Sequence, residues 1–138
     1  MNKNAFVNQV QAVTQLPTPE MAEEGVQIVL SLLSHRLTPE ESRNVQAQLP
    51  QDMKNVWNSD TWITNFLSLS RQAQLKYRRK AELYSLISNE LEKRQLPIGA
   101  EQLAVAVFHV LKAQISEGET QDIAAQLPED IEDVWLAA

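Results

Sequence analysis

The chain alternates between apolar stretches and short polar segments that contain proline. In several stretches apolar residues recur every three or four positions, which places them on one face of an α-helix. In the two longest stretches, over about residues 19–36 and 99–114, part of the expected helix is apolar on nearly every side. Helices of that kind are usually buried, so we expect these two to form the centre of the fold and to pack on each other.

An amphipathic helix is expected before each central helix. Their apolar positions are Phe6, Val10 and Val13 in the first, and Leu83, Tyr84, Leu86, Ile87 and Leu91 in the second. A linking helix is also expected over about 59–70, where the apolar positions are Trp62, Ile63, Phe66 and Leu67. Each of these helices has one face that must find a partner in the core.

Capping boxes predict where two shorter helices begin. Thr38 is followed three residues later by Glu41, and Ser116 by Glu119. In a capping box the hydroxyl accepts a hydrogen bond from the later backbone N–H, and the glutamate accepts one from the N–H of the hydroxyl residue. A box at both places predicts helices that start at about residues 39 and 117.

Leu-Pro pairs end these shorter helices, because proline disfavours helix at the residue before it. The pairs lie at residues 49–50 and 127–128. A further short helix is expected after each, over about 50–57 and about 128–136. Asp52 and Asp130 would then lie in the first turn, where the helix dipole favours acidic side chains.

The chain also matches itself at a shift of 78 residues. Residues 26–57 align with residues 104–135 without a gap, with ten identities in 32 positions. The match is densest at the Ala-Gln-Leu-Pro tetrapeptides. We therefore predict a single all-α domain over residues 1–138, a bundle of about eight or nine helices, in which two pseudo-symmetric copies over about 1–58 and 71–138 share one core.

Particular stretches of both copies carry a family resemblance. In the second copy they are Glu82-Leu83-Tyr84 and residues 107–111, 115–119 and 126–131; in the first they are Val29-Leu30, Arg36-Leu37, Glu41 and residues 48–50. Together they resemble the bacterial family called domain of unknown function 2267, over nearly the whole chain. The resemblance implies an all-helical double repeat of bacterial origin, and it implies neither an activity nor catalytic residues.

Composition narrows the class of protein. Only three glycines occur in 138 residues, which disfavours a strand-rich fold that needs glycine at its turns. Cysteine is absent, so disulfides and cysteine-based metal sites are excluded, and a cytoplasmic location suits the chain. No apolar run is long enough to cross a bilayer and the N-terminal residues show no signal-peptide region, so we expect no contact with a membrane.

Charge is unevenly distributed along the chain. The net charge of −6 divides into −2 for residues 1–58, +3 for residues 59–94 and −7 for residues 95–138. The basic middle part has an aromatic residue among its cations, and the residues are Arg71, Lys76, Tyr77, Arg78, Arg79 and Lys80. Such a group is a candidate nucleic-acid contact.

Two arguments make nucleic acid the alternative interpretation. On a helix the four cations at 76 and 78–80 would spread around the axis, and the acidic remainder of the protein would repel DNA. The simpler interpretation is that the basic segment meets the acidic C-terminal segment of the same molecule, of a second copy or of a partner protein.

Trp57 and Trp135 end the two short helices that follow the Leu-Pro pairs. Tryptophan offers a large apolar face and one hydrogen-bond donor, which suits an interface. Both residues are therefore candidate contacts for a protein partner or for a homodimer, and packing in the core is the other interpretation. Asp52 and Asp130 have a catalytic or cation-binding interpretation as well, but a structural role in a first helical turn fits them better.

Motifs of the common enzyme classes are absent from the sequence. His35 is expected at a helix end and His109 in the core. The acidic residues at 129–133 lack the alternating spacing and the glycine of a calcium loop. We expect no catalytic residue, no cofactor and no metal, and a non-catalytic protein-interaction or structural module; the alternative is a small nucleic-acid-binding or regulatory protein that uses residues 71–80.

Overall fold

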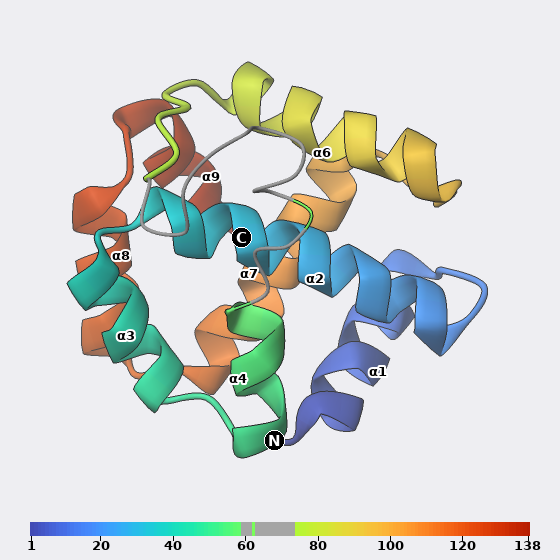
Figure 1. The fold of residues 1–138 in the computed structure, drawn as a ribbon, viewed down its shortest axis with the longest axis horizontal. Helices are drawn as coiled ribbons and strands as arrows, with labels where there is room; N and C mark the ends of the chain where they lie inside the picture. The colour runs from blue at the N-terminus through green and yellow to red at the C-terminus, as the bar shows by residue number, and fades with distance from the viewer. Residues whose placement is uncertain (59–61, 63–73) are drawn as a thin grey trace.

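The computed structural model describes residues 1–58, 62 and 74–138, and every regular element in those ranges is an α-helix. The eight helices described are α1 (Lys3–Thr14), α2 (Pro19–Arg36), α3 (Pro39–Ala47), α4 (Gln51–Trp57), α6 (Lys80–Arg94), α7 (Ala100–Gln114), α8 (Glu117–Gln126) and α9 (Glu129–Ala137) (Figure 1). The prediction of an all-α fold is confirmed. The linking helix predicted over about 59–70 lies outside the described residues, apart from Trp62.

The helices begin and end for local reasons. Four of them have an N-cap side chain that accepts a hydrogen bond from the backbone N–H three residues later, and these caps are Asn2, Thr18, Thr38 and Ser116. Gln15 and Gln95 end α1 and α6 in the left-handed conformation, with φ of 59° and 56°. Pro50 and Pro128 are themselves N-caps, so α4 and α9 each begin one residue later than the sequence pattern predicts.

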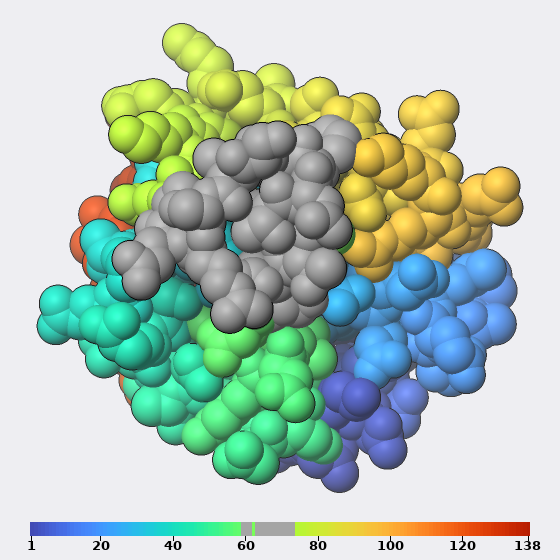
Figure 2. Space-filling view, viewed as in Figure 1, coloured from blue at the N-terminus to red at the C-terminus, as the bar shows by residue number. Residues whose placement is uncertain are grey.

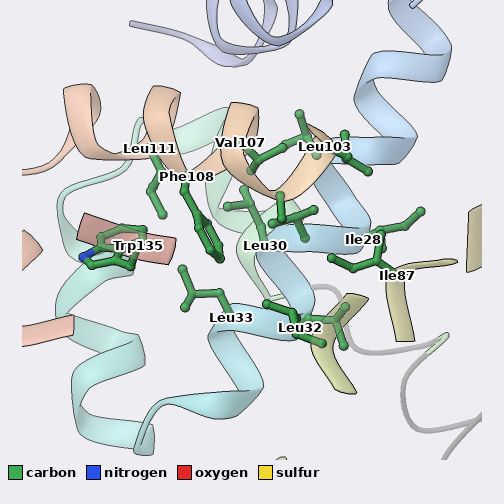
Figure 3. Packing of buried hydrophobic residues seen from close by; sticks show 14 of the residues in the cluster. Ile28, Leu30, Leu32, Leu33, Ile87, Leu103, Val107, Phe108, Leu111 and Trp135 are labelled. Carbon is green, nitrogen blue, oxygen red and sulfur yellow. The ribbon is translucent and has the colours of Figure 1, made fainter. Parts of the chain in front are cut away.

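The centre of the fold is the contact between α2 and α7. Figure 3 shows Leu30 and Leu33 of α2 beside Val107 and Phe108 of α7, and each of the four side chains is at most 1% exposed. Their burial confirms the prediction that the two most apolar stretches form the core. The two helices pack tightly at Gly25, where an added Cβ atom would lie 2.8 Å from Cδ1 of Leu103.

The remaining helices surround this pair. Helices α1 and α6 each pack on both α2 and α7, α4 packs on α2, and α9 packs on α7. Helices α3 and α8 contact each other at one side of the molecule (Figure 1). Around the rim of the face in Figure 2, α3 and α4 lie at the lower left, α1 and α2 at the lower right, and α6 above.

One apolar position of α1 is not in the core. Phe6 and Val10 are fully buried as predicted, whereas Val13 is 55% exposed. Val7 is buried in its place, in a small cluster with Leu16 and Ala22. Among the helices described, none combines the length and the apolar character that crossing a membrane requires.

Candidate functional site

A glutamine at the C-terminal end of each of α3 and α8 caps the N-terminal end of the other helix. Oε1 of Gln126 accepts a hydrogen bond of 2.9 Å from the backbone N–H of Thr38, and its Nε2 donates to the Thr38 hydroxyl at 3.2 Å. Oε1 of Gln48 accepts one of 2.7 Å from the backbone N–H of Ser116. Thr38 and Ser116 are the N-cap residues of α3 and α8, so a side chain from the end of each helix binds the N-terminus of the other.

Only half of each predicted capping box forms. The Thr38 hydroxyl accepts from the backbone N–H of Glu41 at 3.3 Å, and the Ser116 hydroxyl from that of Glu119 at 3.1 Å. The other predicted bond, in which each glutamate accepts from the backbone N–H of Thr38 or Ser116, does not form. A glutamine from the end of the other helix accepts from that N–H instead. The two glutamate carboxylates are left without a capping role.

Glu41 and Glu119 instead meet in the contact between α3 and α8. Each residue is only 6% exposed, and each has a buried Oε1 atom with no hydrogen-bond partner in the described part of the chain. One carboxylate oxygen of each lies within 4.8 Å of the other and of an oxygen of Asp122, which is exposed. The structure thus brings three carboxylates together at the edge of this contact.

Burial raises the pKa of Glu41 from 4.5 to about 7. The carboxyl groups of Glu119 and Asp122 add to this rise, and the amide of Asn44 opposes it. A carboxyl with this pKa takes up a proton near neutrality, and a protonated Glu41 can donate to Glu119. The arrangement can therefore hold a proton between the two buried groups, or a cation among all three.

Trp57 and Trp135 lie in the core, with side chains that are 0% exposed. The indole Nε1 of Trp57 donates to the backbone oxygen of Ser42 at 2.9 Å, and that of Trp135 to the backbone oxygen of Thr120 at 3.0 Å. Phe108 also packs edge-on against Trp135, with ring centroids 5.2 Å apart. No indole surface is left for a partner, so the structure corrects the interpretation of these residues as partner contacts in favour of core packing.

The basic segment is extended rather than helical. Residues 74–78 run beside the C-terminal end of α2, where the backbone N–H of Leu75 donates to the carbonyl of His35 at 2.7 Å. Tyr77 is 6% exposed and donates its hydroxyl to the carbonyl of Leu32 at 2.9 Å, and burial raises its pKa. The ring of Tyr77 is therefore covered by protein, which corrects its interpretation as a nucleic-acid contact.

The cations of the segment remain on the surface, and they are Lys76, Arg78, Arg79 and Lys80. Arg71, the fifth cation named with them, lies outside the described residues. Arg78 and Arg79 line a hollow of about 360 Å³ whose other charged residues are Glu129, Asp130 and Asp133. The structure thus brings the basic segment to the acidic C-terminal segment of the same molecule, one of the three arrangements that the sequence left open.

Asp52 and Asp130 each bind the first residue of another helix. Asp52 accepts two hydrogen bonds, of 3.0 and 3.1 Å, from the backbone N–H of Lys3 at the start of α1. Asp130 accepts one of 2.6 Å from the backbone N–H of Lys80 at the start of α6. Both carboxylates stabilise a helix N-terminus, as the structural interpretation requires, although the helix concerned is not their own.

The two histidines have different surroundings. The Nδ1 atom of His35 makes a 2.8 Å hydrogen bond with the carbonyl oxygen of Ser31, one turn earlier in α2. His109 is exposed, which corrects the expectation that it lies in the core. Its neighbours Phe108 and Val110 are buried, but successive residues of an α-helix point in different directions, so His109 can face solvent between them.

Sequence reasoning missed Glu41, Glu119 and the glutamine caps as a connected group. A signal for them was present: Glu41 aligns with Glu119, and Gln48 with Gln126, at the shift of 78 residues. The apolar and polar faces of a helix do not explain why the same polar residue stands at both matched positions. Such residues are candidates for residues that meet where two copies of a unit face each other.

Comparison with known proteins places this group within a family match. A family described as "Uncharacterized conserved protein (DUF2267)" matches residues 3–134, nearly the whole chain. The matched range includes both helices of the carboxylate cluster. No curated protein matches the sequence.

Proposed function

The chain belongs to the DUF2267 family, and from this premise we propose that the protein is a non-catalytic protein-interaction module whose acidic C-terminal part binds a basic segment of a partner protein. The proposal includes an organisation as two copies of one helical unit, over about 1–58 and 71–138. It also includes a cytoplasmic location, which suits a chain without cysteine.

Matched contacts support the two-copy organisation. Trp57 donates to the backbone of Ser42, and Trp135 donates to the backbone of Thr120, with both members of the second pair 78 positions after those of the first. The glutamine caps at Thr38 and Ser116 are related by the same shift. Contacts of this kind are expected when two copies of a unit fold alike and share a core.

The charged hollow beside the basic segment supports a non-catalytic role. Its lining consists of Arg78, Arg79, Pro128, Glu129, Asp130 and Asp133. This set contains neither a histidine nor a serine, threonine or cysteine that could act as a nucleophile. Asp130 accepts a hydrogen bond of 2.6 Å from the backbone N–H of Lys80 at the start of α6, so it already has a structural role.

The observation that carries the proposal is the charge of the C-terminal helices. Residues 113–138 contain seven carboxylate side chains and neither lysine nor arginine. Glu117, Glu129 and Asp133 are exposed, and the structure shows no ion pair for them within its described ranges. Exposed carboxylates without an ion-pair partner favour a partner protein of opposite charge, by steering the encounter and by excluding acidic partners.

Nucleic acid binding through the basic segment remains the alternative function. Four of its cations are exposed, as a phosphate contact requires. However, Tyr77 is buried, and Arg78 and Arg79 share their hollow with three carboxylates, which would repel a phosphate backbone. The structure therefore favours the acidic surface as the binding surface.

The test measures binding of a fluorescent lysine- and arginine-rich peptide by anisotropy over a series of salt concentrations. We expect binding that weakens with salt and that the triple variant Glu129→Gln, Glu132→Gln, Asp133→Asn reduces. A matched control removes three exposed carboxylates elsewhere, with Glu20→Gln, Glu40→Gln and Glu92→Gln. Both triple variants change the net charge equally, so a difference between them in peptide binding requires that the peptide binds at the C-terminal surface.

Two results would count against the proposal. Equal loss of peptide binding in both triple variants would show that only the total charge matters. Binding of duplex DNA or single-stranded RNA at low salt, abolished by changing Lys76, Arg78 and Arg79 to glutamine, would establish the alternative function instead.

A further inference from the structure

Two buried carboxylates that face each other need a positive charge between them. Glu41 and Glu119 are each 94% buried, given their 6% exposure, and the Oε1 atom of each has no hydrogen-bond partner in the described part of the chain. An ionised carboxylate can only accept hydrogen bonds, so neither group can satisfy the other. No lysine or arginine described in the structure forms an ion pair with them.

The local fold does not account for these carboxylates. At the third position of a helix, a glutamate ordinarily bonds the backbone N–H of the N-cap residue. Here Gln126 and Gln48 occupy those donors, at Thr38 and Ser116. Glu41 and Glu119 are therefore buried at a cost in solvation that capping does not offset.

Asp122 completes a set of three ligands. It lies three residues after Glu119 on α8, and so on the same face of that helix. One oxygen from each of the three side chains lies within 4.8 Å of the other two. Oxygen ligands lie about 2.3–2.6 Å from a calcium ion, so ligands on opposite sides of one ion are about 5 Å apart, and these three can share one.

We propose that Glu41, Glu119 and Asp122 bind a hard divalent cation, of the calcium, magnesium or manganese class, between α3 and α8. The three donors are all carboxylate oxygens, with neither a histidine nor a cysteine among them, which selects this class over zinc or copper. Asp122 is exposed and gives the ion a path from solvent, and water supplies the remaining ligands. Glu119 and Asp122 are among the seven carboxylates of residues 113–138, but the three that test the proposed function, Glu129, Glu132 and Asp133, lie outside this site.

The expected affinity is modest. Only three protein ligands are present, so the dissociation constant should fall near the weak end of calcium sites, about 10⁻⁴–10⁻³ M. The ion would join residues 78 positions apart, and only the folded chain brings them together. It therefore raises the melting temperature, by about 5 °C at ten times the dissociation constant.

The experiment removes metal from the protein with a chelator, then titrates Ca²⁺, Mg²⁺ and Mn²⁺ separately by calorimetry and records thermal unfolding with each. We expect one site per chain for at least one of these ions. Glu119→Gln should weaken the affinity for the ion at least about tenfold. Removing a residue that only supports a metal ligand already costs about that much, and Glu119 is a ligand itself. Asp122→Asn should do the same, and because Asp122 is exposed this variant keeps its fold.

Glu40→Gln and Asp133→Asn are the matched controls, since each removes one exposed carboxylate outside the cluster. Both should bind the ion like the unchanged protein. The proposal is overturned if none of the three ions binds at about 10 mM, ten times the weak limit above, in which case a shared proton occupies the position. It is also overturned if Glu119→Gln and Asp122→Asn bind as tightly as the controls, which would place any ion elsewhere on the acidic surface.

Discussion

Glu41 and Glu119 face each other across the contact between α3 and α8, and one carboxylate oxygen of each lies within 4.8 Å of the other. Each belongs to a helix whose N-terminus is capped by a glutamine of the opposite helix. Each cap joins the start of one helix to the end of the other, and with α3 and α8 held against each other the two carboxylates lie close together. Glu41 and Glu119 stand at positions where a glutamate usually caps its own helix, and here they form a pair of carboxyl groups that are distant in the chain.

This pair predicts a pH dependence of stability in metal-free buffer. The pKa of Glu41 is raised to about 7 when the protein is folded, against 4.5 for an unperturbed glutamate. The folded state therefore holds the proton more tightly, and the stability that Glu41 contributes is full below about pH 4.5 and is lost as the pH rises to about 7. Glu41→Gln keeps the shape without the charge, so its stability should rise relative to the unchanged protein across this window.

The gain expected for Glu41→Gln at pH 8 over that at pH 4.5 is about 1–3 kcal/mol, measured by urea unfolding with a chelator present. Glu40→Gln changes the exposed neighbouring residue of α3 and should show no such trend. A constant difference between Glu41→Gln and the unchanged protein at all pH values would contradict the prediction.

The glutamine caps predict a cost for shortening either side chain. Gln48→Ala and Gln126→Ala each leave a helix N-terminal N–H without its partner, so each should lower the free energy of unfolding by about 0.5–1.5 kcal/mol. Gln121→Ala, at an exposed position of α8, should stay within about 0.5 kcal/mol of the unchanged protein. Equal effects of all three substitutions in urea unfolding would show that the caps contribute nothing.

The two tyrosines predict opposite responses to loss of the hydroxyl. Tyr77 donates its hydroxyl to the carbonyl of Leu32 at 2.9 Å, so Tyr77→Phe should destabilise the protein by about 1 kcal/mol. The buried hydroxyl of Tyr84 has no hydrogen-bond partner in the part of the chain that the structure describes. Tyr84→Phe should therefore be neutral or stabilising, and thermal unfolding of the two variants side by side decides the matter.

Two helical glycines should also differ. At Gly118 an added Cβ meets no atom closer than 4.0 Å, so Gly118→Ala should stabilise α8 by up to about 1 kcal/mol. At Gly25 the Cβ would lie 2.8 Å from Cδ1 of Leu103, which is fully buried and has little room to move. Gly25→Ala should lower stability by about 1–3 kcal/mol in denaturant unfolding, and a stabilised Gly25→Ala would disprove the tight contact of α2 with α7.

Local chemistry made most helix limits predictable. Thr38 and Ser116 cap α3 and α8 through their own hydroxyls, and the Leu-Pro pairs separate these helices from α4 and α9. Each signal acts within four residues, so no tertiary contact is needed to interpret it. The most apolar stretches were likewise predictable as the core, because few polar residues interrupt them.

Surface and site residues were harder to predict, because their roles depend on segments that are distant in the chain. On the sequence alone the residues around Tyr77 are treated as part of a helix, but the hydrogen bond from Tyr77 to Leu32 belongs to an extended segment beside α2. The sequence left both core packing and an interface open for Trp57 and Trp135, and their burial in the folded chain decides for the core. Periodicity gives the face of a helix and does not say what covers that face.

The sequence by itself determined an all-α chain, the limits of most of its helices and the two apolar helices of its core, because these follow from interactions between near neighbours. Only the tertiary structure decided what Glu41, Glu119 and Asp122 do together. Their meeting depends on the packing of α3 against α8, whose contacting residues lie about 80 positions apart. Chain spacing cannot reveal such a contact, whereas in the folded protein it buries two carboxylates that need a proton or a cation between them.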